Sequence, residues 1–247
     1  MRKVITIYIV AFAVFSFADS VDELLKIGDH FLNRGEWQEA LQRYHRAYAI
    51  DSENPYVLYR LGAGYNRLAL NFSGKIKNDT LRLANSYITS ALRNERNIAE
   101  AHCELAYNLT LMSLLHENWE DFAIARRIKE EIDWTLKLDP DIALIHFIYG
   151  IWHKVVSEVS ILKRKPHGLG DASKEEIIPE FKKAVQLDPE KAQYWLQLGL
   201  QYLETGDTTS ALKFLQRAMN SKPLPINKPY IESAEQMIRN LTDEDNN

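Results

Sequence analysis

Residues 192–223 read AQYWLQLGLQYLETGDTTSALKFLQRAMNSKP, and the spacing of their apolar and small residues is the clearest indication of the architecture. On both sides of Thr205-Gly206-Asp207, apolar and small residues recur every three or four positions, as they do along amphipathic helices. Glycine is typical of the end of a helix and aspartate of the start of the next. The stretch therefore predicts two antiparallel helices, over 192–204 and 208–220.

The same pattern recurs toward the N-terminus. An apolar-Asp-Pro-like element recurs at 50–52, 138–140 and 187–189, with a degenerate copy at 94–96. Together with Pro223, it places the unit ends at residues 52, 96, 140, 189 and 223, with spacings of 44, 44, 49 and 34. A small residue stands where the two helices of each unit would cross, where the size of the side chains sets the interaxial distance. These residues are Gly28, Gly62, Ala106, Gly150 and Gly199. Self-similarity at such periods indicates a solenoid of stacked helix pairs.

The pattern predicts an all-α solenoid of about five helix pairs with elongated middle units. First helices are expected near 21–34, 55–70, 99–116, 142–162 and 192–204, and second helices near 37–49, 80–94, 120–137, 174–187 and 208–220. A last helix near 229–241 caps the open end, as solenoids require. The extra length becomes a loop at 71–78 and a basic loop at 163–171. The helical repeat domain thus spans 19–242, followed by a polar tail at 243–247.

Trp195-x-x-Leu198-Gly199-x-x-Tyr202, continued by small and apolar residues in the second helix, resembles the tetratricopeptide (TPR) signature. More narrowly, residues 54 to about 241 resemble the regulator of microtubule dynamics family. The resemblance lies in stretches such as YRLG at 59–62, RRIKEEID at 126–133 and HFIYGIW at 146–152. It implies a TPR-like adaptor without enzymatic activity. Some members are anchored by an N-terminal apolar segment, and some are implicated in membrane tethering and lipid binding or transfer.

The N-terminus has the three parts of a secretory signal: Arg2 and Lys3, an uncharged apolar run over 4–17, and small residues before Asp19. The run is shorter than the ~20 residues that a spanning helix needs. We therefore expect residues 1–18 to be a cleaved signal peptide, with an uncleaved anchor as the alternative. The chain is then periplasmic or extracellular, and attached to the membrane if the signal is not cleaved.

Composition excludes several classes of function. The net charge of −4 offers no basic excess for nucleic acid. The single cysteine, Cys103, excludes a disulfide framework. No metal-binding, nucleophile-elbow or nucleotide-loop motif occurs, and His146 and His153 occupy helix-packing positions. We expect no catalytic residues, no metal and no cofactor.

First helices line the inner groove of such solenoids, and their inward positions here are mostly apolar. The candidate groove residues are Leu25, Tyr59, Ala63, Tyr107, Phe147, Ile151, Lys154, Leu196 and Leu200. The lysine and asparagine that clamp a peptide carboxylate in some TPR modules are absent from the corresponding positions. An apolar groove suits an amphipathic helix or an acyl chain. The alternative is that these side chains are core.

Lys163, Arg164 and Lys165 are candidates for contact with anionic headgroups or a phosphate, or else form a solvated loop. The function predicted from the sequence is an exported, non-catalytic scaffold that binds a protein partner, a peptide or amphipathic helix, through its concave groove. A carrier of lipids or hydrophobic small molecules is the alternative, and an enzyme with an unrecognised site is a second one.

Overall fold

The computed structural model describes residues 20–116 and 122–244, which form twelve α-helices and no strand. The helices are α1 (Val21–Arg34), α2 (Trp37–Ile50), α3 (Pro55–Leu68), α4 (Gly74–Asn94), α5 (Ala99–His116), α6 (Phe122–Leu138), α7 (Ala143–Ser157), α8 (Ile161–Arg164), α9 (Ile177–Leu187), α10 (Ala192–Glu204), α11 (Thr208–Met219) and α12 (Lys228–Glu244). Short 3-10 turns follow α3 (Ala69–Asn71) and α8 (Lys165–His167). The predicted all-α solenoid is confirmed. The predicted signal segment 1–18 lies outside the described residues.

Helix starts follow from local chemistry. The Ser20 hydroxyl accepts a hydrogen bond from the Glu23 amide, and the Asn54 side chain accepts one from the Tyr56 amide ahead of Pro55. Asp207 caps α11 in the same way through the Ser210 amide. Each cap satisfies an amide that the first turn of a helix leaves without a partner.

Two predicted segments differ from the structure. The loop expected at 71–78 is mostly helix, because α4 begins at Gly74 rather than near residue 80. Its first two turns are largely exposed, so they carry no apolar periodicity that a sequence could show. The first helix expected at 142–162 ends at Ser157, and the basic segment after it forms α8 and a 3-10 turn.

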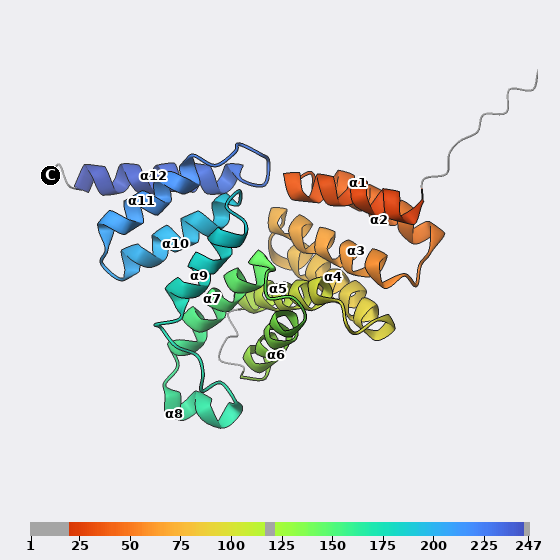
Figure 1. Cartoon of the computed structure of the whole chain (residues 1–247), viewed down its shortest axis with the longest axis horizontal. Coiled ribbons are helices and arrows are strands. Elements are labelled where there is room, and N and C mark those ends of the chain that lie inside the picture. Colours follow the sequence, from red (N-terminus) through yellow and green to blue (C-terminus); the bar gives the residue numbers. More distant parts are fainter. Residues whose placement is uncertain (1–19, 117–121, 245–247) are drawn as a thin grey trace, which may run out of the picture.

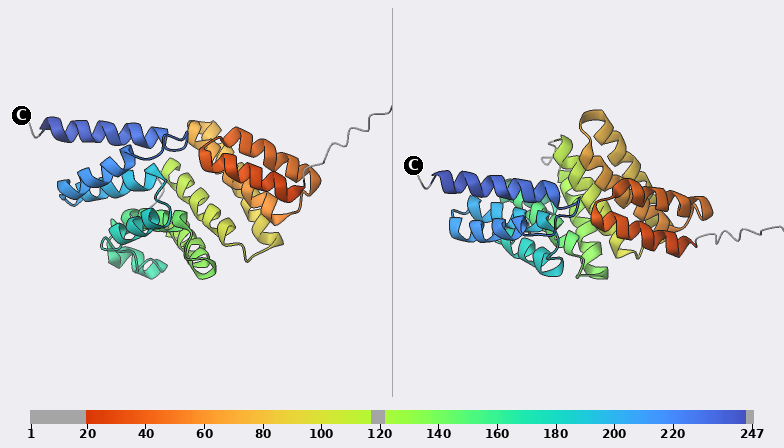
Figure 2. Two further views of the ribbon diagram at one scale, coloured as in Figure 1. Left: turned by 45° about the horizontal axis from the view of Figure 1, so that its top comes forward. Right: turned by 90° about the horizontal axis from the view of Figure 1, so that it is seen from above.

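The helix pairs follow one another in an arc that returns to its beginning (Figure 1). The start of α12 lies beside the end of α1, and the turned views show the same arrangement (Figure 2). The Ile226 amide, in the loop between α11 and α12, donates a hydrogen bond of 3.2 Å to the Arg34 carbonyl. We call this contact between the α1–α2 turn and the α11–α12 loop the clasp. It converts an open groove into a ring.

A buried polar network crosses the middle of the arc. The Asn108 amide group donates to the Asn66 side chain at 2.7 Å and to the Leu81 carbonyl at 2.9 Å. Asn66 in turn donates to the carbonyl and the carboxylate of Glu104, both at 3.1 Å. Because each bond joins α5 to α3 or to α4, the network fixes how the second unit stacks on the third.

The same hydrogen bond from a ring nitrogen to a backbone carbonyl occurs in each of three units. The imidazole Nε2 atoms of His102 and His146, and the Trp195 indole, each meet the carbonyl six residues earlier, all at 2.9 Å. Each histidine also places Nδ1 against a carboxylate of its unit's second helix, Glu131 at 2.6 Å and Glu180 at 2.7 Å. The histidines therefore substitute for the tryptophan of the repeat signature and add an ion pair when protonated.

The His146 pair predicts a pH effect on stability. Burial disfavours the His146 imidazolium, but the hydrogen bonds to Glu180 and to the Pro140 carbonyl outweigh it and raise the pKa. The folded state then binds the proton more tightly than the unfolded chain. The stabilisation is complete below the ordinary histidine pKa and is lost as pH rises through the higher folded value. We expect the melting temperature to fall less between about pH 6 and pH 8 in His146→Gln than in the parent protein. His30→Gln, at an exposed histidine of α1, is the control and should behave as the parent. An equal fall in all three proteins would contradict the assignment.

Candidate functional site

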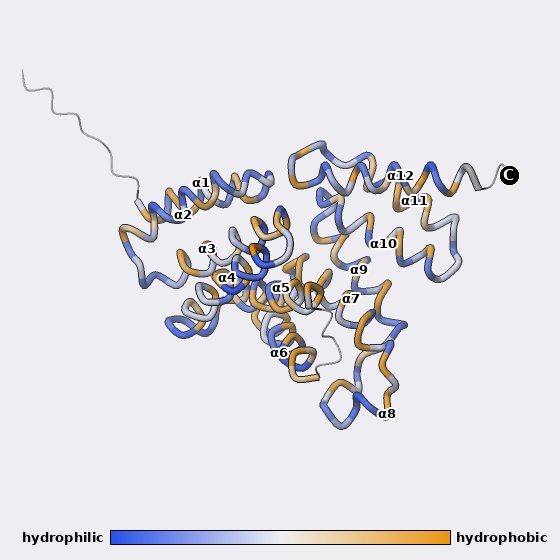
Figure 3. The backbone as a smooth tube through the Cα atoms, turned by 180° about the vertical axis from the view of Figure 1, so that it is seen from behind, coloured by the Kyte–Doolittle hydropathy of each residue, from blue (hydrophilic) through white to orange (hydrophobic). Residues whose placement is uncertain are grey.

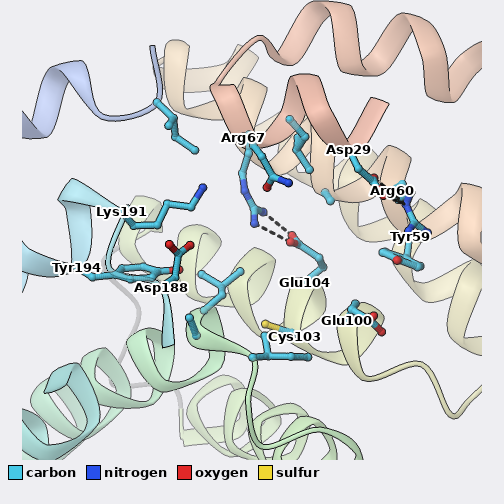
Figure 4. Close-up of a pocket in the computed structure, with 17 residues that line it drawn as sticks. Asp29, Tyr59, Arg60, Arg67, Glu100, Cys103, Glu104, Asp188, Lys191 and Tyr194 are labelled. Atoms are coloured by element: carbon cyan, nitrogen blue, oxygen red, sulfur yellow. Dashed lines mark hydrogen bonds and ion pairs between the residues drawn. The ribbon is translucent and has the colours of Figure 1, made fainter. Parts of the chain in front are cut away.

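The inner face of the ring holds a half-open pocket of about 400 Å³. Its walls come from α1, α3, α5, the first turns of α7 and α10, and Ile226 of the clasp. Apart from Ile226, the lining comes from the first helices of all five units and the turns just before them, so the pocket lies on the concave face (Figure 4).

Arg67 and Glu104 form the central ion pair of the pocket. The guanidinium of Arg67 donates to both carboxylate oxygens of Glu104, at 2.5 and 2.6 Å, and lies over the Tyr107 ring. Burial opposes the charged guanidinium, but the Glu104 carboxylate outweighs burial and raises the pKa of Arg67. The guanidinium thus stays charged, and the bidentate geometry fixes the Arg67 side chain.

A second ion pair stands between α1 and α3. The Arg60 Nε donates to Asp29 at 2.8 and 3.0 Å, and the Tyr44 hydroxyl donates to the same carboxylate at 2.7 Å. Burial, together with the Asp29 charge, raises the pKa of Tyr44, so its hydroxyl stays protonated. Asp29 therefore links α2 to α3 while presenting its edge to the pocket.

Lys191 differs from the two arginines. Its ammonium group reaches into the pocket toward Arg67 (Figure 4), and in the part of the chain that the structure describes it makes no ion pair or hydrogen bond. Burial lowers its pKa, which the nearby Asp188 carboxylate partly offsets and the Arg67 charge reinforces. Lys191 is thus the cation of the pocket that lacks a partner among the described residues.

Cys103 lines the pocket but is only 2% exposed. Burial raises the pKa of its thiol well above the ordinary value, which keeps it protonated and unreactive. No histidine is among the lining residues that the structure describes, so none of them places an imidazole base beside this thiol. The described residues also contain no cluster of three or more side chains suited to a metal ion.

The structure brings two of the predicted groove residues together, since Tyr59 and Ala63 both line the pocket. Leu25 lines a shallower hollow beside it, between α1 and α3. Tyr107, Phe147 and Leu196 are at least nine-tenths buried and belong to core clusters. Phe147 packs against Phe181 and Tyr194, so it is a core side chain, the alternative to a groove position.

The remaining groove candidates lie farther along the arc, outside the pocket. Ile151 packs against the apolar core between α7, α9 and α10, and Leu200 packs against the one between α10, α11 and α12. Lys154 forms an ion pair with Glu204. Of the three basic candidates, Lys163 and Lys165 are exposed, but Arg164 is buried and donates to the Val159 and Leu169 carbonyls. The expectation that Arg164 contacts anions is therefore wrong, because its guanidinium holds the turn together from inside.

Sequence reasoning missed Arg67, Glu104 and Lys191. Arg67 stands near the end of a first helix, at a position that faces the groove of such solenoids, and this position was available as a signal. Lys191 precedes α10, and Glu104 is 37 residues from its partner, so neither has a local pattern that marks it.

The profile of the family described as regulator of microtubule dynamics protein 1-3 matches residues 24–242. The chain belongs to this family. The match covers every helix pair and most of α12, so the family's repeat domain accounts for nearly all of the described structure. No curated protein matches the chain. Among the described residues, no helix has the length and apolar character to cross a bilayer.

Solved structures share the repeat architecture. The thermophilic TPR protein TTC0263 of Thermus thermophilus is 17% identical, with a TM-score of 0.64, and the match covers 88% of this chain and all 100% of that one. MamA from Desulfovibrio magneticus RS-1 is 19% identical over 81% of this chain and 93% of its own, with a TM-score of 0.46. YrrB, described as a TPR protein with an unusual peptide-binding site, is 15% identical over 88% of this chain and 93% of its own, with a TM-score of 0.43. The first of these confirms the TPR-like fold.

Proposed function

We propose that the protein is a non-catalytic scaffold that binds a short segment of a protein partner in the central pocket. The observation that carries the proposal is the ring itself, because the clasp closes the concave face around a pocket lined by all five units. A ligand there touches every unit at once, so that the rigidity of the solenoid positions it.

The lining favours a peptide over an acyl chain. Seven of the 17 residues around the pocket are charged: Asp29, Arg60, Arg67, Glu100, Glu104, Asp188 and Lys191. Asp29 pairs with Arg60 and Arg67 with Glu104, but an acyl chain would bury the other three groups without offering them partners, which costs free energy. A peptide backbone and its polar side chains supply both donors and acceptors, while Tyr59, Ala63 and Leu144 give apolar contact.

The size of the pocket favours an extended segment over a helix. A volume of about 400 Å³ lies in the lower part of the range for small-ligand sites. A helix with its side chains is about 10–12 Å across, too wide for several turns to enter. We infer that a chain end or a loop of a few residues enters the ring and leaves one carboxylate beside Lys191.

Export remains part of the proposal. It rests on residues 2–18, whose charge and apolar pattern is that of a secretory signal. Cleavage after Ala18 would leave the repeat domain intact, since α1 begins at Val21.

A matched pair of substitutions tests the pocket. Peptides that bind the full chain are selected from a display library, and their affinities are measured by fluorescence anisotropy. Ala63→Leu should weaken binding at least tenfold, because Ala63 lines the pocket and the added carbons occupy it. Ala49→Leu makes the same change on an exposed face of α2 and should leave the affinity unchanged.

Two results would contradict the proposal. Peptides that bind Ala63→Leu and the parent protein equally well would place the site elsewhere. A mass of a few hundred daltons that accompanies the native protein in mass spectrometry, and is lost on denaturation, would favour a small-molecule carrier instead. Circular dichroism of both variants checks that the helices persist.

A further inference from the structure

The most exposed large apolar side chain of the described structure is Leu162, at 84%, and Ile161 beside it is 51% exposed. Both lie on α8, in a segment of residues 158–170 that we call the α8 finger. The finger projects from the edge of the arc (Figure 1), and hydrophobic colouring reaches the α8 label there (Figure 3). Two adjacent apolar side chains in water at a projecting tip are not explained by the core or by the pocket.

The finger is held firmly from inside. The Arg164 Nε donates to the Val159 carbonyl at 3.1 Å, and a second guanidinium nitrogen donates to the Leu169 carbonyl. Leu169 itself is fully buried in the apolar core that it forms with α5, α6 and α7. The His167 ring stacks on Phe122 of α6, with ring centroids 4.4 Å apart. The exposure of Leu162 is thus a property of a rigid turn.

Among the residues that the structure describes, the charged side chains at the tip are basic. Lys163 and Lys165 are exposed and make no ion pair within the described residues. The acidic groups at the base of the finger are already neutralised, Glu158 by Lys174 at 2.7 Å and Asp171 by Lys129 at 3.1 Å. The tip therefore combines two cations that have no ion pair among the described residues with two exposed apolar side chains.

We propose that the α8 finger docks on an anionic phospholipid surface, with Leu162 and Ile161 entering the headgroup region and Lys163 and Lys165 contacting lipid phosphates. A bilayer needs no matching shape, and lysine stems can lie along its apolar boundary while their ammonium groups stay in water. This surface is separate from the pocket, so the inference does not rest on the proposed function.

Other occupants fit the finger less well. A protein partner needs a buried centre surrounded by a rim, with roughly 1,000 Å² or more of contact, and a narrow convex tip does not offer this. A second copy of the chain, related by a two-fold axis through the tip, would bring Lys163 and Lys165 against themselves. Only an anionic partner without fixed shape uses both the apolar and the cationic groups.

The test places an environment-sensitive fluorophore at single positions of the full chain. Leu162→Cys carries the NBD group at the tip, and Ile50→Cys carries it at a 58% exposed apolar position beside Asp51. Ile76→Cys carries it on α4, at a 62% exposed position between Lys75 and Lys77. The parent protein, whose Cys103 is buried, gives the background labelling.

With vesicles of equal parts phosphatidylglycerol and phosphatidylcholine, we expect blue-shifted, stronger emission at position 162, quenched by bilayer spin labels. Positions 50 and 76 should not respond. Lys163→Glu combined with Lys165→Glu should lower the apparent affinity at least tenfold, because each basic residue near an anionic surface contributes about one kcal/mol.

Three outcomes would overturn the inference. One is an equal response at position 162 with phosphatidylcholine alone, since the lysines would then have no role. Another is a response at position 50 or 76 as strong as that at 162, which would place a different surface on the bilayer. The third is no response at position 162, which would leave the tip to a protein partner or to solvent. Comparison between positions on the same chain keeps the test independent of any membrane affinity of residues 4–17.

Discussion

Glu104→Gln is expected to destabilise the protein by about 3 kcal/mol, because it leaves the Arg67 guanidinium buried without a counter-charge. The two side chains are only 16% and 10% exposed, so water cannot replace the lost carboxylate. Glu104 also receives the Asn66 amide, and its loss disturbs the network that joins α3 to α5. Urea denaturation followed by circular dichroism measures the change in the free energy of unfolding.

Glu100→Gln is the matched control for this prediction. Glu100 lies one turn earlier on α5, also lines the pocket, and is exposed. The same change there should alter the free energy of unfolding by less than about 0.5 kcal/mol. Adding Arg67→Met to Glu104→Gln should restore part of the loss, since no buried charge then remains unpaired. If the two glutamine variants unfold at the same urea concentration, the Arg67–Glu104 pair does not stabilise the fold.

The sequence predicts the helices best where their apolar faces are buried. The bounds expected for the first helices at 21–34 and 192–204 are those of α1 and α10. Each of these helices has a small residue at its crossing, Gly28 and Gly199, where an added Cβ would lie 2.3 Å from Tyr44 and 2.9 Å from Leu215. A position that only glycine can occupy can be recognised in the sequence. The exposed start of α4 has neither a glycine at a helix crossing nor an apolar periodicity, and there the prediction was wrong.

The pocket could be predicted only in part. Periodicity shows which side chains of a first helix face inward, and this placed Tyr59 and Ala63 on its wall. It does not show which inward residues a neighbouring unit covers, and Phe147 is covered by Phe181 and Tyr194. Nor does it show how far the arc curves, because curvature accumulates from small rotations between units. The clasp contact and the approach of Lys191 to Arg67 both require that curvature.

Gly35→Ala is expected to open the ring. Gly35 ends α1 at a φ of +86°, a left-handed conformation that costs other residues about 1–2 kcal/mol. A Cβ at this position would lie 2.4 Å from the Ile226 nitrogen and 2.8 Å from its Cα, and backbone atoms cannot move aside as a flexible side chain can. The substitution must therefore break the clasp and its hydrogen bond. We expect a larger radius of gyration in small-angle X-ray scattering, together with a lower melting temperature.

Gly206→Ala is the control that separates the backbone strain at a positive φ from the clash with Ile226. Gly206 ends α10 at a φ of +82°, and its amide donates to Leu203 as the Gly35 amide does to Leu32. An added Cβ there meets nothing within 4 Å, so this variant suffers only the backbone strain. Gly35→Ala should exceed it in destabilisation by about 1–3 kcal/mol, the usual range for a packing clash, and should alone change the radius of gyration. Equal destabilisation and unchanged dimensions in both variants would mean that the clasp adds no stability. The closure of the pocket would then depend on the stacking of the units, and the hydrogen bond from Ile226 to Arg34 would be its consequence rather than its cause.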